Sequence, residues 1–103
     1  MSRRADRVAE AIRREASLLI NEKVRDPRVG FVTVTKATIS DDLRNAVIYC
    51  SVLGDEKSRK TAMKGLKSAM KFIRAEIGHR LELRYIPEIR VCEDDTLEYA
   101  DRI

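Results

Sequence analysis

The sequence is poor in the residues that most enzyme and metal sites require. Its 103 residues include one histidine, two cysteines, four glycines and no tryptophan. His79 alone does not make a His-based triad in any familiar motif. The isolated Cys50 and Cys92 do not form a zinc or redox cluster, and no glycine-rich phosphate loop occurs. These absences argue against the common hydrolase, zinc-protein and nucleotide-binding classes, and we expect neither a cofactor nor catalytic activity.

Long apolar runs are also missing. None approaches the roughly 18 residues that a membrane helix needs, and residues 1–6 lack the apolar core of a signal peptide. We therefore expect a cytoplasmic protein. In that compartment Cys50 and Cys92 are expected to be reduced, buried thiols, since a disulfide would require their two strands to lie side by side.

Length and charge indicate one small basic domain. A chain of 103 residues has the size of one compact domain, which we assign to residues 1–103. Its net charge of +4 is uneven: residues 56–90 hold ten basic and four acidic groups, whereas residues 91–103 hold one basic and five acidic groups. A basic block of this kind favours a polyanionic partner.

Hydrophobic periodicity predicts an α+β domain. Apolar residues that recur every three or four positions indicate two amphipathic helices, and runs of β-branched residues indicate three strands. The first two strands are joined by Ser-Asp-Asp at 40–42, which favours an antiparallel hairpin. The expected elements are helices over 4–24 and 58–78 and strands over 31–39, 46–53 and 87–92.

The second predicted helix has an irregular phase. Phe72 falls roughly 130° from the middle of the stripe of Met63, Leu66 and Ile73 on an ideal helix. Either Phe72 makes a second contact, or the helix breaks into two segments, with Gly65 as one weak point. We expect a break, so the predicted order is α-β-β-α-(kink)-α-β.

The most specific feature is a line of positive charges on this helix. Its members step by four, three, four and three and so share one side of a helix: Lys60, Lys64, Lys67, Lys71 and Arg74. Glu76 is the only acidic residue between Lys57 and Arg80. Like charges at these spacings destabilise a helix by roughly 0.2–0.5 kcal/mol per pair. We interpret the line as a phosphate-binding surface for RNA rather than a solvated face.

Five further arginines are assigned to RNA binding, each with a competing explanation. Arg3, Arg4 and Arg7 would extend the surface from the first helix, or pair with acidic neighbours on that helix. Arg80 and Arg84 would contact phosphate, or favour the helix C-terminus electrostatically.

Short segments spread over the whole chain, taken in their order and spacing, resemble the ribosome-binding factor A family. They are Arg7-Val8, Ile12-Arg13-Arg14-Glu15, Asp26-Pro27-Arg28, Thr33-Val34-Thr35, Ser40-Asp41-Asp42-Leu43, Val52-Leu53-Gly54, Phe72-Ile73-Arg74, Leu83-Arg84 and Pro87-Glu88-Ile89. The resemblance implies a KH type II-like fold, with a three-stranded sheet packed by helices and without the GxxG loop of KH domains. In place of that loop the family has an Ala-x-Gly helix kink, which falls at Ala69, Met70 and Lys71 here, with lysine instead of glycine.

The resemblance also implies a function. It implies a bacterial assembly factor that binds 16S rRNA in immature 30S subunits, aids maturation of the 16S rRNA 5′ region and supports growth in the cold. The implied partners extend to ribosomal proteins or an assembly GTPase. We expect a monomer with no membrane partner.

Two other functions stay open from the residues alone. One is a metal-dependent nuclease that uses Asp94, Asp95 and Glu98. The other is a protein-interaction module whose basic helix binds an acidic protein partner. With only three tyrosines and two phenylalanines, recognition by base stacking is disfavoured, and readout of the backbone and shape of structured RNA is favoured.

Overall fold

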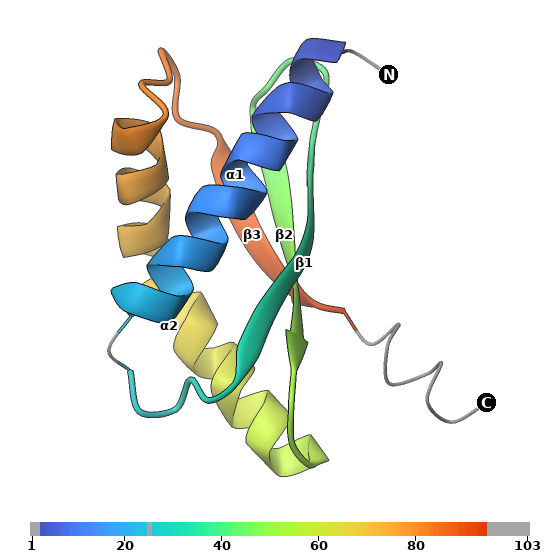
Figure 1. Ribbon diagram of the computed structural model, residues 1–103, viewed down its shortest axis with the longest axis vertical. Coiled ribbons are helices and arrows are strands. Elements are labelled where there is room, and N and C mark those ends of the chain that lie inside the picture. The colour runs from blue at the N-terminus through green and yellow to red at the C-terminus, as the bar shows by residue number, and fades with distance from the viewer. Residues whose placement is uncertain (1–2, 25, 95–103) are drawn as a thin grey trace, which may run out of the picture.

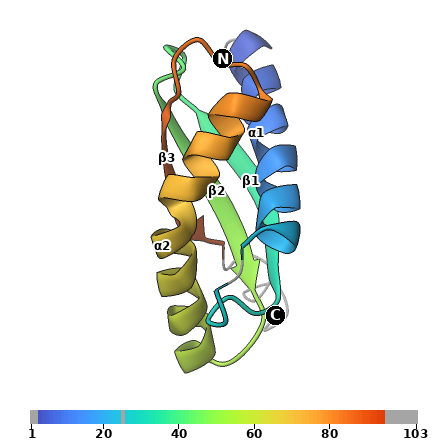
Figure 2. The ribbon, with the colours of Figure 1, turned by 90° about the vertical axis from the view of Figure 1, so that its left-hand side faces the viewer.

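The chain forms a two-layer α+β domain in which both helices lie on the same face of a three-stranded sheet (Figures 1 and 2). The computed structural model describes residues 3–24 and 26–94. Its elements are α1 (Arg3–Glu22), β1 (Val32–Ile39), β2 (Asn45–Val52), α2 (Glu56–Arg80) and β3 (Glu88–Glu93). The predicted α+β class and the order of helices and strands along the chain are confirmed, apart from the break in the second helix. Neither helix in this described part is long and apolar enough to cross a membrane.

The sheet has the order β1-β2-β3, so β2 is its central strand. β1 and β2 are antiparallel, as the hairpin prediction requires, whereas β2 and β3 are parallel. A parallel pair needs a crossover connection, and α2 supplies it across one face of the sheet. β3 is therefore an edge strand, and among the described residues β2 is its only strand neighbour.

Side chains, rather than a glycine, build the turn between β1 and β2. The Ser40 hydroxyl donates to the Asp42 carboxylate at 2.6 Å and accepts from the backbone N–H of Asn45 at 3.1 Å. The Asp42 carboxylate also accepts from the backbone N–H of Arg44 at 3.1 Å, and these hydrogen bonds lower the pKa of Asp42. They hold a turn in which Leu43 adopts the left-handed φ of 61°.

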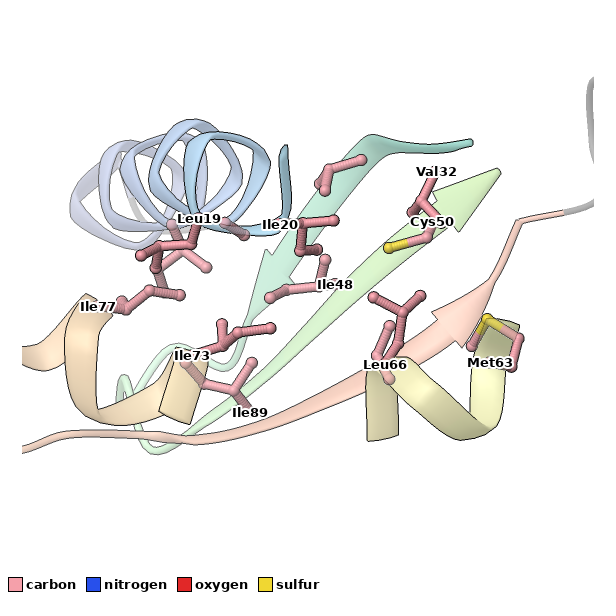
Figure 3. Packing of buried hydrophobic residues seen from close by; sticks show 14 of the residues in the cluster. Leu19, Ile20, Val32, Ile48, Cys50, Met63, Leu66, Ile73, Ile77 and Ile89 are labelled. Carbon is pink, nitrogen blue, oxygen red and sulfur yellow. The ribbon is translucent and has the colours of Figure 1, made fainter. Parts of the chain in front are cut away.

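The core lies between the two helices and the inner face of the sheet (Figure 3). Alternation along β2 places Ile48 and Cys50 on this inner face, because successive side chains of a strand point to opposite sides. The bulky side chains that are essentially inaccessible to solvent come from α1, β2 and α2: Ile12, Leu19, Ile48, Cys50, Leu66, Ile73 and Ile77.

α2 is a single continuous helix, so the prediction of two separate helical segments is wrong. Its two halves nevertheless run in different directions (Figures 1 and 2). The Ser68 hydroxyl donates to the carbonyl oxygen of Lys64 at 3.1 Å, a bond that often bends helices without interrupting them. Phe72 is 44% exposed, so its irregular phase marks a second surface of α2 and not a break.

Gly65 serves close packing rather than a break in α2. A Cβ atom there would lie 2.9 Å from Cγ2 of Val29 and 3.2 Å from Cβ of Arg28, so only glycine lets the loop after α1 approach this closely. The Asp26 carboxylate holds that loop by accepting hydrogen bonds from the guanidinium and the backbone N–H of Arg28. These bonds lower the pKa of Asp26 to about 2.

The two free cysteines lie on adjacent strands but on opposite faces of the sheet. Cys50 is buried, and this burial raises the pKa of its thiol to about 12. Cys92 is exposed, so the prediction that both thiols are buried is wrong for Cys92. The alternation of side chains along a strand explains the difference: Cys50 is paired with Glu93, and Cys92 with Tyr49 on the outer face.

Candidate nucleic-acid interface

The lysines of α2 form an exposed row. Lys60, Lys64, Lys67 and Lys71 were predicted, and Lys57 continues the series at the start of the helix; all five are exposed. At about 100° per residue, the five positions span only about 80° of the helix circumference. We call these five residues the lysine row. Lys57 was missed, although its three-residue step to Lys60 is the same signal.

Most of the lysine row has no acidic partner. Within residues 3–24 and 26–94, the side chains of Lys57, Lys64, Lys67 and Lys71 make no ion pair or hydrogen bond. Nζ of Lys60 lies 3.2 Å from Glu56, but both side chains are more than 70% exposed, so this pair contributes only about 0.3–0.5 kcal/mol. The row is therefore a nearly uncompensated strip of positive charge.

A groove of about 440 Å³ runs between the lysine row and the edge strand β3. The residues that line it come from these two elements alone: Lys60, Met63, Lys64, Lys67, Val91, Cys92 and Glu93. Glu93 is already paired with Nε of Arg59 at 3.1 Å, so the lysines dominate the charge of the groove. A cationic wall beside an apolar floor suits an RNA strand whose phosphates lie on the lysines.

Arg74 shares the spacing of the row but is engaged inside the protein. Its guanidinium donates to the carbonyl oxygens of Pro87 at 2.8 Å and Ile86 at 2.9 Å, and it lies 3.5 Å from Glu88. Arg74 therefore fastens the segment before β3 to α2. Since its guanidinium is already bonded, we remove Arg74 from the predicted phosphate-binding line. Helical spacing could not reveal these contacts, because the carbonyl groups belong to a distant part of the chain.

Arg80 is engaged in the same way, whereas Arg84 is not. The Arg80 guanidinium bridges the helices, with 3.2 Å to Glu15 on α1 and 3.7 Å to Glu76 on α2. Arg84 is exposed, and its guanidinium lies 5.6 Å from the centre of the Tyr85 ring. Of this predicted pair, only Arg84 has no carboxylate partner among the described residues.

The arginines of α1 are exposed but do not extend the lysine row. α1 and α2 run in opposite directions, so the first turns of α1 lie at the end of the molecule where α2 finishes and far from where α2 begins (Figures 1 and 2). Arg3, Arg4 and Arg7 thus lie at the other end of the molecule from Lys57, contrary to the expected continuous surface. Arg4 instead lines a pocket together with Arg84.

The segment predicted as a helix kink lies between two different flanks of α2. Ala69 and Met70 pack partly buried against the core, while Lys71 is exposed on the basic flank. The opposite flank, with Phe72, borders a hollow of about 650 Å³ shared with Pro27 and the loop after α1. RNA binding by Lys71 stays a prediction.

The acidic residues of the nuclease alternative fall largely outside the described chain. The Asp94 carboxylate accepts a hydrogen bond from the Thr35 hydroxyl at 2.6 Å. Asp95 and Glu98 lie outside the described residues. Within residues 3–24 and 26–94, no three His, Cys, Asp or Glu side chains come together as a metal site would require.

The order of elements, the mixed sheet and the basic groove beside its edge strand define a KH type II-like α+β domain. The sequence model of one family, ribosome-binding factor A, matches residues 4–103. The chain therefore belongs to the ribosome-binding factor A family.

Individual relatives agree with this assignment. Ribosome-binding factor A of Macrococcus caseolyticus (strain JCSC5402) is 43% identical over 103 residues, which are 100% of this chain and 90% of that protein. The solution NMR structure of a ribosome-binding factor A candidate from Thermotoga maritima has a TM-score of 0.79 at 33% identity, covering 95% of this chain and 93% of that one. A homology model of Thermus thermophilus ribosome binding factor A, fitted into a cryo-EM map of its 30S complex, has a TM-score of 0.70. At 21% identity and with coverage of 84% and 91%, it shows the same fold.

Proposed function

We propose that this protein is a non-catalytic assembly factor that binds 16S rRNA in immature 30S subunits through the lysine row and the groove beside it. The observation that carries the proposal is the set of exposed lysines without acidic partners that line or continue this groove. Membership of the ribosome-binding factor A family supports the small subunit as partner, as does the 30S complex of the Thermus relative.

The proposed mechanism is a shift in an RNA folding equilibrium. Lysine ammonium groups bind phosphates as flexible point charges, so the row recognises the path of an RNA backbone rather than a base sequence. A protein that binds one rRNA conformer more tightly than its competitors raises the population of that conformer without breaking a bond. In this way the protein aids maturation of the 16S rRNA 5′ region, and its help matters most in the cold, where misfolded conformers rearrange slowly.

The protein acts as a monomer in the cytoplasm, where ribosomes are assembled. Because RNA would occupy only one flank of α2, the rest of the surface is compatible with contacts to ribosomal proteins or an assembly GTPase.

The nuclease alternative is tested by incubating the purified protein with precursor rRNA and magnesium. Specific cleavage of the RNA would contradict a non-catalytic role.

A salt titration tests the electrostatic mechanism. Five phosphate contacts from the lysine row predict that the logarithm of the binding constant falls with the logarithm of salt concentration at a slope of about −3.5 to −4.5. The measurement is fluorescence anisotropy with a fragment of precursor 16S rRNA. A slope near zero contradicts the proposal.

Co-sedimentation tests the partner. The protein should travel with free small subunits in a sucrose gradient and not with whole ribosomes. Mild RNase treatment should release it, because RNA is the proposed ligand. If the protein stays bound to the ribosomal proteins that remain after RNase treatment, the result would instead support the alternative, in which the basic helix binds an acidic protein.

A further inference from the structure

Three arginines converge at the end of the molecule opposite the start of the lysine row. Arg4 lies in the first turn of α1, Arg44 in the turn between β1 and β2, and Arg84 in the connection from α2 to β3. These three segments meet at one end of the domain (Figures 1 and 2) and enclose a pocket of about 350 Å³. This volume falls in the range of small-ligand sites, roughly 300–1,000 Å³. We call it the arginine pocket.

The charge of the arginine pocket is only partly compensated by a neighbouring carboxylate. The pKa of Asp42 is lowered mainly by its hydrogen bond from Ser40, and the positive charge of Arg44 contributes less. Among the described residues, the guanidiniums of Arg4 and Arg44 make no ion pair, and that of Arg84 only faces the Tyr85 ring. Of the described residues that line the pocket, Asp42 is the one acidic residue, and its carboxylate accepts hydrogen bonds from the Ser40 hydroxyl and the backbone N–H of Arg44. Three positive groups around one committed carboxylate leave a net positive site, further strengthened by the positive end of α1.

The rest of the arginine pocket is apolar. Its floor is formed by aliphatic side chains from α1, β1 and the two connections: Val8, Ile39, Leu43, Leu83 and Pro87. Tyr85 also lines it and is 74% exposed, so most of its ring is accessible to a ligand. An apolar lining with one aromatic ring and three guanidiniums matches the two parts of a nucleotide, a base and a phosphate.

We infer that the arginine pocket binds a single unstacked nucleotide of the RNA, with the base against Tyr85 and the apolar floor and its phosphates on Arg4, Arg44 and Arg84. The inference rests on the proposed function, which supplies RNA as the ligand, and adds a second contact remote from the lysine row. It also qualifies the expectation drawn from the scarcity of aromatic residues, because one well-placed tyrosine suffices to hold one base.

Free mononucleotides test the pocket without the rest of the RNA. Uridine monophosphate, inorganic phosphate and uridine are titrated separately into the full ¹⁵N-labelled chain, and amide shifts are followed by NMR. We expect uridine monophosphate to shift the amides of residues 43–45 and 83–86 with a dissociation constant on the order of millimolar. Inorganic phosphate and uridine should each bind at least about fivefold more weakly, because each offers only one of the two parts.

Two variants and one control separate the roles of the base and the phosphate. Tyr85→Ala should weaken uridine monophosphate about fivefold or more and leave inorganic phosphate unchanged, since only the base stacks on the ring. The double variant Arg44→Ala/Arg84→Ala should abolish both shifts, whereas Arg14→Ala/Arg90→Ala, two exposed arginines outside the pocket, should not. All of these side chains are exposed, so the variants are expected to fold.

Three results would overturn the inference. Equal affinity for phosphate and uridine monophosphate would remove the base from the site, and the absence of shifts at residues 43–45 and 83–86 would remove the site. Stronger shifts of these amides by a poly-glutamate peptide would reassign the pocket to an acidic protein.

The same experiment separates this inference from the proposed function. A variant with Lys64, Lys67 and Lys71 changed to glutamate should lose affinity for immature 30S subunits yet still bind uridine monophosphate in the arginine pocket. If that lysine variant binds the subunits normally, the proposed function fails. The nucleotide titration still shows whether the arginine pocket binds a nucleotide.

Discussion

The two halves of α2 carry cations at similar helical spacing but use them differently. In the first half and at the bend, Lys57, Lys64, Lys67 and Lys71 point away from any acidic partner among the described residues. In the second half, Arg74 and Arg80 are engaged by groups from other elements. The planar guanidinium can bridge two acceptors, so these arginines join parts of the fold. Spacing along a helix thus locates a cation, but its neighbours in space decide whether it is available.

Charge reversal in the lysine row is expected to give the largest effect. In Lys64→Glu/Lys67→Glu/Lys71→Glu, three phosphate contacts are lost at about 1 kcal/mol each, so affinity for precursor 16S rRNA should fall by about 100-fold or more. The magnitude of the salt slope should fall by about 2 to 3. Both are measured by fluorescence anisotropy across a salt series.

The matched control changes the same amount of charge elsewhere. Arg14→Glu/Lys23→Glu/Lys36→Glu alters three exposed cations that do not belong to the lysine row. Its effect should be at least tenfold smaller if the row is a specific contact surface. Equal losses in the two triple variants would mean that only net charge matters, and the row would lose its assigned role.

The second half should respond in stability instead of in binding. Arg74→Ala leaves the carbonyl oxygens of Pro87 and Ile86 without their donor, so the free energy of unfolding should fall by about 1–3 kcal/mol in urea denaturation. Lys64→Ala, an exposed side chain without partners, should change it by no more than about 0.5 kcal/mol. The salt slope of RNA binding should be unchanged in Arg74→Ala. A stable Arg74→Ala protein with a smaller slope would return Arg74 to the phosphate-binding surface.

Cys92 provides a reporter at the groove. Its thiol is exposed, whereas burial raises the pKa of Cys50 to about 12, so iodoacetamide at neutral pH should modify Cys92 alone. Bound RNA should slow this modification severalfold, because Cys92 lines the groove beside the lysine row. Peptide mass spectrometry gives the site and the rate. Unchanged reactivity in a saturated complex would show that the RNA does not cover the β3 side of this groove.

The smallest expected effect concerns the loop that packs on Gly65. The pKa of Asp26 is lowered from 3.8 to about 2 by Arg28, so the ionised carboxylate stabilises the folded state at any pH above about 3.8. That contribution should disappear as the pH falls from about 3.8 towards 2. Asp26→Asn should be less stable than the wild-type protein at pH 6, and the difference should shrink at pH 2 to 3 in thermal unfolding. A pH-independent difference would contradict the assigned role of this ion pair.

Local patterns in the chain were sufficient for most of the architecture. Alternation along 46–53 and three-to-four spacing along 58–78 reflect which side chains must be buried, so the elements and their order could be read directly. The same spacing located the lysines on one side of α2. Lys57 was missed although it follows that rule, whereas Phe72 was misread because an irregular phase has two structural causes that a single sequence does not separate.

What the sequence by itself determined is therefore the set of elements, the amphipathic faces and the side of α2 that carries positive charge, because each depends on residues close together in the chain. Only the tertiary structure decided that Arg74 and Arg80 are engaged, that Cys92 is exposed and that three arginines from separate segments share one pocket. Each of these outcomes depends on atoms brought together from distant positions. The interaction of a charged or reactive side chain depends on distance in space, and that distance is not set until the elements have packed against one another.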